Sequence, residues 1–169
     1  MKLSKRSIGA LAAALGMSLF FTLTGSPAGA GGDFMMTIEK VVDGDAPPGT
    51  VFVVDLNCSE APNSGTTQVT FDAAGDPVPA GSNLLDWSPF VPIGGITCVP
   101  SEQPLPGFST TYACLSTNSA ECSAPGPQPA PIQVTTIGTG TATVTVTNTP
   151  LPPPPPPPPA PVAEPRFTG

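Results

Sequence analysis

Three polar residues that could together form an amide bond occupy strand faces that are otherwise apolar. In an extended strand, residues two apart share a face. By this alternation Lys40 and Asn148 face inward, and so does Glu102 if the extended conformation continues through Pro100. Their apolar neighbours are Met36 and Ile38 for Lys40, Val144 and Val146 for Asn148, and Ile96 and Cys98 for Glu102. The pattern therefore predicts an amine, an amide and a carboxyl group in the interior.

Burial would give these three groups an unusual reactivity. Removal from water disfavours the charged form of an amine or a carboxyl group. A neutral Lys40 amine beside Asn148, with protonated Glu102 polarising the amide, could attack the side-chain carbonyl carbon and release ammonia. That reaction would happen once per chain and leave a Lys–Asn cross-link. The alternative is that Lys40 extends to the sheet edge and Asn148 only ends a strand.

The four cysteines offer a second kind of covalent cross-link. In an exported chain they are most simply two disulfide bonds, for which three pairings exist. Alternation places Cys58 and Cys98 on inward faces of separate strands, which favours a bridge between strands or sheets. Cys114 and Cys122 would then close an eight-residue loop. A zinc site or a redox-active dithiol is the alternative, but no C-x-x-C pair is present.

One tryptophan is a candidate for ligand binding. Trp87, with Phe90 and Tyr112, could form a platform on which a carbohydrate stacks. In a small sandwich a single tryptophan is more often part of the core. Both interpretations remain open at this point.

Composition excludes most enzyme chemistry and several kinds of partner. The 169 residues include no histidine, which removes Ser/His/Asp and Cys/His arrangements and histidine-ligated metals. Asp43-Gly44-Asp45 resembles part of a calcium loop but lacks the remaining acidic positions, so we expect a turn, no metal site and no cofactor. Outside residues 1–30 only Lys40 and Arg166 oppose 12 acidic residues, a formal charge of −10. Such a surface would repel nucleic acid.

The two ends of the chain differ in composition from its middle. Residues 1–30 have a basic start, an apolar stretch and Ala28-Gly29-Ala30, which together are typical of a secretory signal peptide. Residues 150–169 include eight consecutive prolines, Pro152 to Pro159, and predict a disordered, proline-rich tail with polyproline II structure. We interpret it as a spacer, with a docking ligand as the alternative, and expect no transmembrane anchor after signal cleavage.

The middle of the chain, residues 31–149, must supply the elements that position the candidate residues. Short alternating runs separated by Gly, Pro, Asn and Asp are typical of an antiparallel β-sandwich. Turns are expected at Asp43–Gly49, at Ala73–Pro77 and at Gly138-Thr139-Gly140. The predicted strands lie near residues 35–42, 50–58, 66–71, 84–90, 95–99, 109–114, 132–137 and 141–148.

Several of these segments carry a family resemblance. They are Thr37–Thr50, the strand with Cys58, Gly95–Cys98 and Val144–Thr149. Over about residues 34–149 the chain resembles a domain of unknown function from actinobacterial surface proteins, which is itself similar to the prealbumin-like B-type repeats of collagen-binding adhesins and to SpaA-type pilin domains. The resemblance implies an immunoglobulin-like or prealbumin-like Greek-key sandwich of about seven or eight short antiparallel strands.

The resemblance also implies roles for individual residues. Lys40 matches the first-strand lysine and Asn148 the last-strand asparagine of cross-linking members, and Glu102 loosely matches their mid-domain acid. Such proteins often carry several copies and a Leu-Pro-x-Thr-Gly sorting signal. Here there is one copy, and the chain ends in Pro165-Arg166-Phe167-Thr168-Gly169, which speaks against covalent attachment to the cell wall.

These observations together predict a non-enzymatic module that is secreted or displayed on the cell surface. We expect a monomer that acts as a structural or adhesive unit, with host or cell-wall surface molecules as its partners. One alternative is an extracellular ligand-binding module, for instance for carbohydrate through Trp87. Another is a small secreted inhibitor of a second protein.

Overall fold

The described part of the chain folds into seven β-strands. A computed structural model describes residues 32–89, 91–124 and 126–158. These residues form strands and no helix, which confirms the predicted all-β fold. No helix among them is long and apolar enough to cross a membrane. The strands are β1 (Phe34–Val42), β2 (Phe52–Cys58), β3 (Gln68–Phe71), β4 (Leu84–Asp86), β5 (Ile96–Glu102), β6 (Phe108–Cys122) and β7 (Val134–Pro150).

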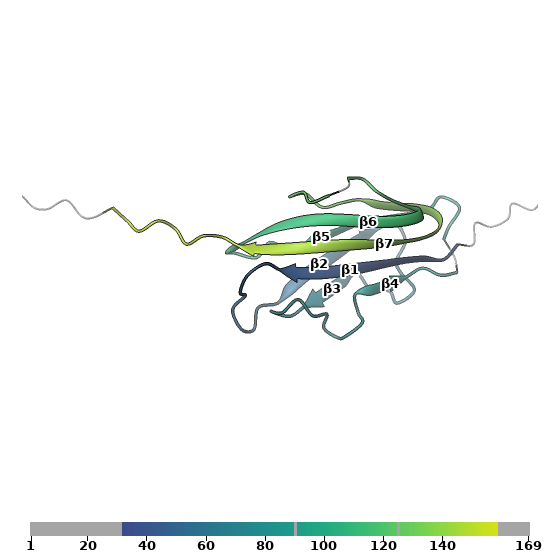
Figure 1. Cartoon of the computed structure of the whole chain (residues 1–169). Helices are drawn as coiled ribbons and strands as arrows, with labels where there is room; N and C mark the ends of the chain where they lie inside the picture. The colour runs from purple at the N-terminus through teal and green to yellow at the C-terminus, as the bar shows by residue number, and fades with distance from the viewer. Residues whose placement is uncertain (1–31, 90, 125, 159–169) are drawn as a thin grey trace, which may run out of the picture.

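Strand β7 takes part in both layers of a sandwich-like fold. Its residues Gly140 to Asn148 pair in parallel with β1, whereas Val134 to Thr136 pair antiparallel with β5. β4 extends the sheet beyond β1, and β2 and β3 extend it beyond β5. β6 accompanies β7 along both parts. Figure 1 shows the consequence: β1, β6 and β7 form the near layer, and β2, β3 and β5 cross behind them.

The β6–β7 hairpin reaches both layers because it bends. The pairing register shifts between Asn118 and Ala120, and Asn118 has a left-handed backbone with φ of 57°. On the facing strand Gly140 permits a close approach: a Cβ there would lie 2.8 Å from the Ala120 nitrogen and 2.9 Å from the Thr117 oxygen. The expected turn at Gly138-Thr139-Gly140 is therefore wrong. These glycines lie inside one continuous strand that replaces the two predicted near 132–137 and 141–148.

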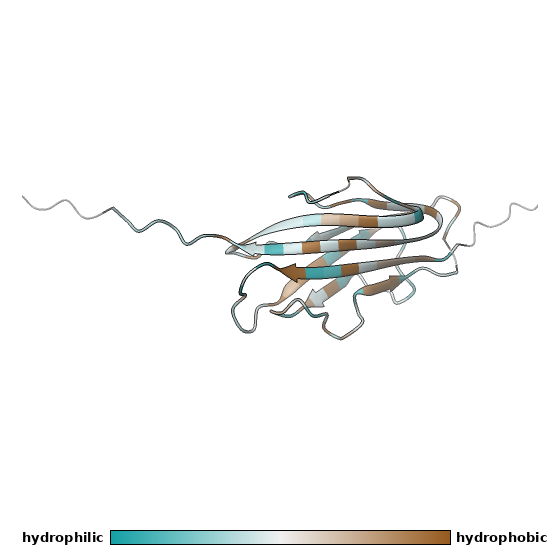
Figure 2. Cartoon of the chain, in the orientation of Figure 1, coloured by the Kyte–Doolittle hydropathy of each residue, from teal (hydrophilic) through white to brown (hydrophobic). Residues whose placement is uncertain are grey.

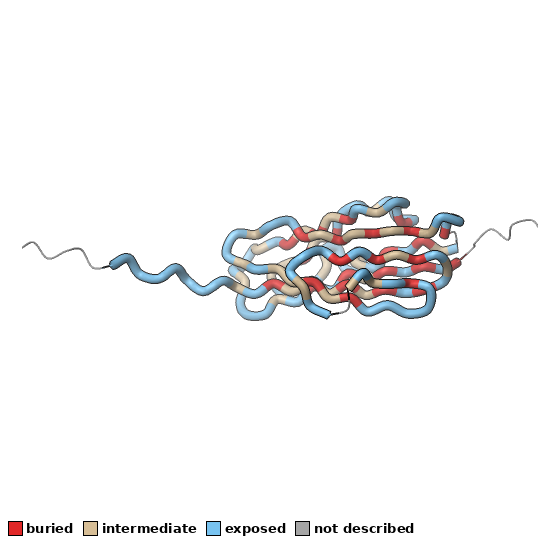
Figure 3. The backbone as a smooth tube through the Cα atoms, turned by 90° about the horizontal axis from the view of Figure 1, so that it is seen from above, coloured by how far each residue is buried: buried red, intermediate tan, exposed pale blue. Residues whose placement is uncertain are grey.

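Alternating burial along the strands builds a single core. β5 alternates between buried and half-buried positions along its whole length, and β1 and β7 from Gly140 onward alternate in a similar way. Figure 2 shows alternating hydropathy along β1 and β7, and Figure 3 shows buried positions between exposed ones along the backbone. Each fully buried large aliphatic or aromatic side chain contributes about 1.5–3 kcal/mol to folding. The largest of these side chains belong to Phe34, Phe52, Phe71, Met36, Ile38, Leu85, Ile96 and Ile132.

Two further features differ from the prediction. The pairing of β1 with β7 is parallel, although antiparallel strands were expected. β6 and β7 are also long, with 15 and 17 residues, because a bent hairpin can continue through both layers.

Residues 1–30, interpreted as a signal peptide, and residues 159–169 of the proline-rich tail lie outside the described residues. Residues 151–158 are exposed and pair with no strand.

Candidate functional site

Lys40, Glu102 and Asn148 meet in the interior near the C-terminal ends of β1 and β7. Lys40 pairs in register with Val146, and Asn148 pairs with Val42, so the amine and the amide come from neighbouring strands of one layer. The Lys40 Nζ contacts Oδ1 of Asn148 and lies 3.3 Å from the Val146 carbonyl oxygen. Glu102 comes from β5 in the opposite layer, and its Oε1 lies 3.0 Å from Nζ.

Glu102 reaches this point because β5 stays extended through Pro100. Pro100 pairs with Leu56 of β2. Hydrogen bonds to a neighbouring strand alternate along an antiparallel pair. Gln103 donates its backbone N–H to β2, so Pro100 and Glu102 direct their backbone nitrogens away from β2. Pairing of β5 with β7 ends at Cys98, so the missing N–H of Pro100 leaves no strand hydrogen bond unmade.

Two residues of β6 hold Glu102 from the opposite layer. The Tyr112 hydroxyl oxygen accepts the Glu102 backbone N–H at 2.9 Å. The Thr110 hydroxyl donates to Oε2 of the Glu102 carboxylate at 2.8 Å. Burial raises the pKa of Tyr112, so its hydroxyl stays protonated. Neither contact could be predicted from strand patterns, because both cross from one layer to the other.

The site is buried, and burial affects the Lys40 amine most. The side chains of Lys40 and Glu102 are 0% and 1% exposed, and Asn148 is 0% exposed. Desolvation lowers the pKa of Lys40, against the attraction and hydrogen bonding of Glu102, which raise it. The Nζ also lies 4.4 Å from the centre of the Phe52 ring. Among the described residues the Asn148 side-chain nitrogen, Nδ2, has no hydrogen-bond partner.

This arrangement contains the parts that amide exchange needs. A lysine with a lowered pKa is a better nucleophile near neutral pH than an exposed lysine. Its nitrogen touches the amide group it would attack, and a carboxyl group stands beside it as an acid–base partner. The sequence interpretation in which Lys40 extends to the sheet edge does not fit, because its side chain is fully buried.

The structure contains two disulfide bonds. Cys58 and Cys98 occupy opposite positions on β2 and β5, with their Cα atoms 4.0 Å apart. Cys114 and Cys122 both belong to β6 and have Cα atoms 6.1 Å apart. Eight extended residues would span about 27 Å, so this bond ties the two ends of the β6 bend. The eight residues that this bond closes were predicted to be a loop, but they lie within the bent strand β6.

Trp87 does not offer a surface for ligand stacking. It is 3% exposed, its ring lies 5.1 Å from that of Phe34, and its indole N–H donates to the Glu60 carbonyl oxygen. Tyr112 is also buried, and Phe90 lies outside the described residues. The tryptophan is therefore a core residue, and the expectation of a stacking platform is corrected. Over the described ranges, no cluster of acidic or cysteine side chains could hold a metal ion.

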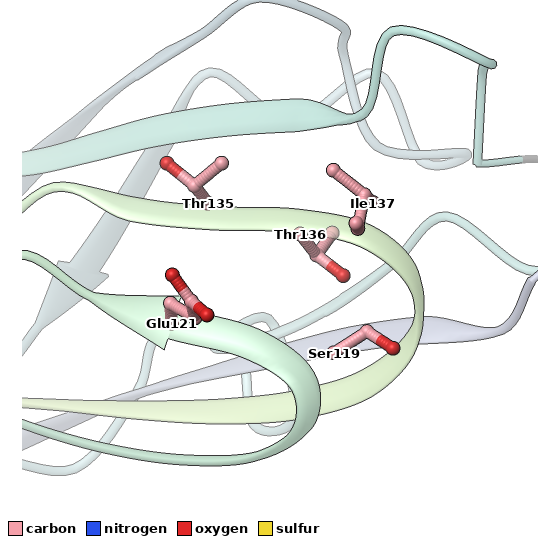
Figure 4. A pocket seen from close by; sticks show the side chains of 5 residues that line it. All are labelled: Ser119, Glu121, Thr135, Thr136 and Ile137. Atoms are coloured by element: carbon pink, nitrogen blue, oxygen red, sulfur yellow. The ribbon is translucent and has the colours of Figure 1, made fainter.

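A small pocket lies beside the bend of the β6–β7 hairpin. Its volume is about 170 Å³. Figure 4 shows its lining side chains, which come from β7 and from the second half of β6. They are Ser119, Glu121, Thr135, Thr136 and Ile137. None of the residues singled out from the sequence lines this pocket.

Comparison with known proteins gives distant structural matches. No protein-family model and no curated protein matches the chain. Two crystal forms of a Mobiluncus mulieris adhesin, described as containing intramolecular disulfide, isopeptide and ester bond cross-links, are 18% and 19% identical, with TM-scores of 0.42 and 0.41 over 71% and 70% of this chain. The major pilin protein T3.2 of Streptococcus pyogenes is 13% identical, with a TM-score of 0.39 over 71%. The chain spans 41%, 40% and 45% of those chains.

Proposed function

We propose that this chain is an exported structural or adhesive module of the cell surface, whose strands β1 and β7 are joined by an amide bond between Lys40 and Asn148. The observation that carries the proposal is the fully buried contact of the Lys40 amine with the Asn148 amide, beside Glu102. Burying a charged lysine is costly. A reaction that turns it into a neutral amide removes that cost.

The reaction balances without an external reagent. The Lys40 ammonium first passes a proton to Glu102, which gives a neutral amine and a carboxylic acid. Nζ then bonds to Cγ of Asn148, and the Cγ–Nδ2 bond breaks. A proton from Nζ passes through the Glu102 carboxyl group to Nδ2, which leaves as ammonia. Nδ2 has no hydrogen-bond partner among the described residues, so its departure also removes an unsatisfied buried donor.

The position of the bond supports a mechanical role. β1 and β7 lie side by side over nine register pairs and run in the same direction. The chain therefore enters at one end of this pair and leaves at the other, where residues 151–158 continue outward (Figure 1). A force on the two ends would pass from β1 through Lys40 and Asn148 into the last residues of β7. The rest of the domain would carry little of it.

Export is part of the same proposal and rests on the sequence. Residues 1–30 have the composition of a signal peptide. Two disulfides suit an oxidising compartment outside the cytoplasm. The partners we propose are cell-wall or host surface molecules. Because the chain is its own substrate and reacts once, this chemistry does not make it an enzyme.

The test is the intact mass of the secreted protein, measured with and without reductant. We expect the mature chain to lack four hydrogens, which reductant restores, and one ammonia, which it does not restore. The mass of the Asn148→Ala variant should show no loss of ammonia from its own calculated mass. Asn57→Ala, at an exposed position of β2, is the matched control and should still lose it. A wild-type chain that keeps the full ammonia mass refutes the cross-link.

A further inference from the structure

The Glu102 carboxylate has two oxygens in different surroundings. Oε2 accepts the Thr110 hydroxyl at 2.8 Å. Oε1 lies 3.0 Å from the Lys40 Nζ and contacts no other polar partner among the described residues. The hydrogen bond from Thr110 therefore makes the two oxygens different: Oε2 already accepts a hydrogen bond, whereas Oε1 faces the reacting groups.

We infer that Thr110 is a positioning residue for the cross-linking step, because its hydroxyl assigns the transferable proton to Oε1 of Glu102. The inference rests on the proposed cross-link. A carboxyl group can carry a proton on either oxygen. With Oε2 accepting from Thr110, a proton on Oε2 would compete with that hydrogen bond. The proton received from Lys40 therefore occupies Oε1, within reach of Nζ.

The position of Thr110 in the sheet makes this role possible. Thr110 pairs in register with Asn148 across β6 and β7. One strand position thus holds the amide, and the neighbouring position holds the hydroxyl that orients the acid. Tyr112, two residues further along the same face, accepts the Glu102 backbone N–H. β6 consequently fixes Glu102 at its backbone and at one carboxylate oxygen.

Thr110 does not touch the atoms whose bonds change. It neither gives nor receives a proton in the balanced reaction, in which Glu102 alone relays the proton from Nζ to Nδ2. Its effect is to hold the relay in one orientation. Positioned acid–base groups contribute roughly 100-fold to 10,000-fold to rates, and we assign about tenfold of this to the orientation.

The experiment follows cross-linking in the folded protein. Unfolded, unreacted chains of wild type, Thr110→Val, Thr110→Ser and Thr111→Val would be refolded with their disulfides at acidic pH, where the Lys40 amine carries its proton and cannot attack. A jump to neutral pH starts the reaction, and intact mass gives the rate of ammonia loss. Thr111→Val is the matched control, because its side chain lies on the opposite face of β6. Thr110→Ala is a second hydroxyl-free variant, for use if valine prevents folding.

We expect Thr110→Val to react about tenfold more slowly than wild type, with Thr110→Ser and Thr111→Val within about threefold of it. Recovery by serine separates positioning from packing, since serine restores the hydroxyl but not the methyl group. Wild-type rates in folded Thr110→Val, or equal slowing in the valine and serine variants, would overturn the inference and leave the cross-link standing. A wild-type chain that never loses ammonia refutes the cross-link itself, and this inference with it.

Discussion

The cross-linking chemistry proposed for this domain depends on one buried lysine. Lys40 has no exposed side-chain surface, and its charge is balanced by one carboxylate, that of Glu102. Such a pair gains from Coulomb attraction but loses the solvation of two ions, and the loss can exceed the gain. Cross-linking would convert this costly pair into an amide and a carboxyl group. The unreacted site should therefore be a local weakness of the fold.

Stability of the unreacted fold should rise with pH. In Asn148→Ala the cross-link cannot form. Burial lowers the pKa of Lys40 below its ordinary value of 10.5, so between the two values the unfolded chain binds more protons than the folded chain, and raising the pH favours folding. Urea unfolding between about pH 7 and 9.5 should show this increase. This pH range ends below 10.0, the ordinary pKa of a tyrosine. Above that pH the raised pKa of Tyr112 means that the folded chain binds more protons than the unfolded chain, so Tyr112 lowers the stability as the pH rises.

The control for this prediction is the double variant Lys40→Met, Asn148→Ala. Methionine fills similar space without a titrating group, so the increase with pH should disappear. A flat profile in Asn148→Ala itself would contradict the assignment of a desolvated amine at Lys40.

Sequence patterns predicted which residues enter the site but not how they are held. Alternation along a strand places Lys40 and Asn148 on inward faces, and this prediction does not depend on how the two layers are arranged. Glu102 required the strand to continue past Pro100, which depends on β7 leaving β5 at Cys98. Thr110 and Tyr112 could not be found, because their contacts with Glu102 depend on how the layers face each other.

At the scale of elements, the bent β6–β7 hairpin joins the layers. Gly140 allows the two strands to stay close through the bend, and Cys114 and Cys122 tie its ends. Glycines between polar residues ordinarily indicate a turn. Here the same conformational freedom serves a close approach inside a strand. Local sequence cannot distinguish these two uses, since the neighbour that requires the glycine lies on β6.

The two disulfides should contribute unequally to stability. In the loop-entropy model, the Cys58–Cys98 bond, with a sequence separation of 40, contributes about 4 kcal/mol. The Cys114–Cys122 bond, with a separation of 8, contributes about 2.5 kcal/mol. Paired Cys→Ala substitutions in the Asn148→Ala background, measured by urea unfolding, should show this order. A larger loss from the Cys114 pair would mean that the bend itself depends on its disulfide.

At the scale of the whole molecule, the central feature is the parallel pairing of the first and last described strands. Forces on the two ends would shear all β1–β7 hydrogen bonds together. Hydrogen bonds alone would yield in time, whereas an amide bond between Lys40 and Asn148 would not. The exposed residues 151–158 continue from β7 and would pass the load onward (Figure 1).

Stretching single molecules tests this account most directly. With handles at the two ends of the described chain, the disulfide-bonded wild-type domain should not extend beyond the few residues outside Lys40 and Asn148. Asn148→Ala should unfold in one step of roughly 210 Å. The 116 residue steps from Phe34 to Pro150, less the 40 and 8 steps closed by disulfides, leave 68 steps. These 68 steps span about 245 Å when extended at about 3.6 Å per residue. The folded domain already spans about 33 Å of this, because Phe34 lies opposite Gly140 and Pro150 lies ten strand residues further on. A wild-type domain that releases this same length would contradict the proposed covalent joint.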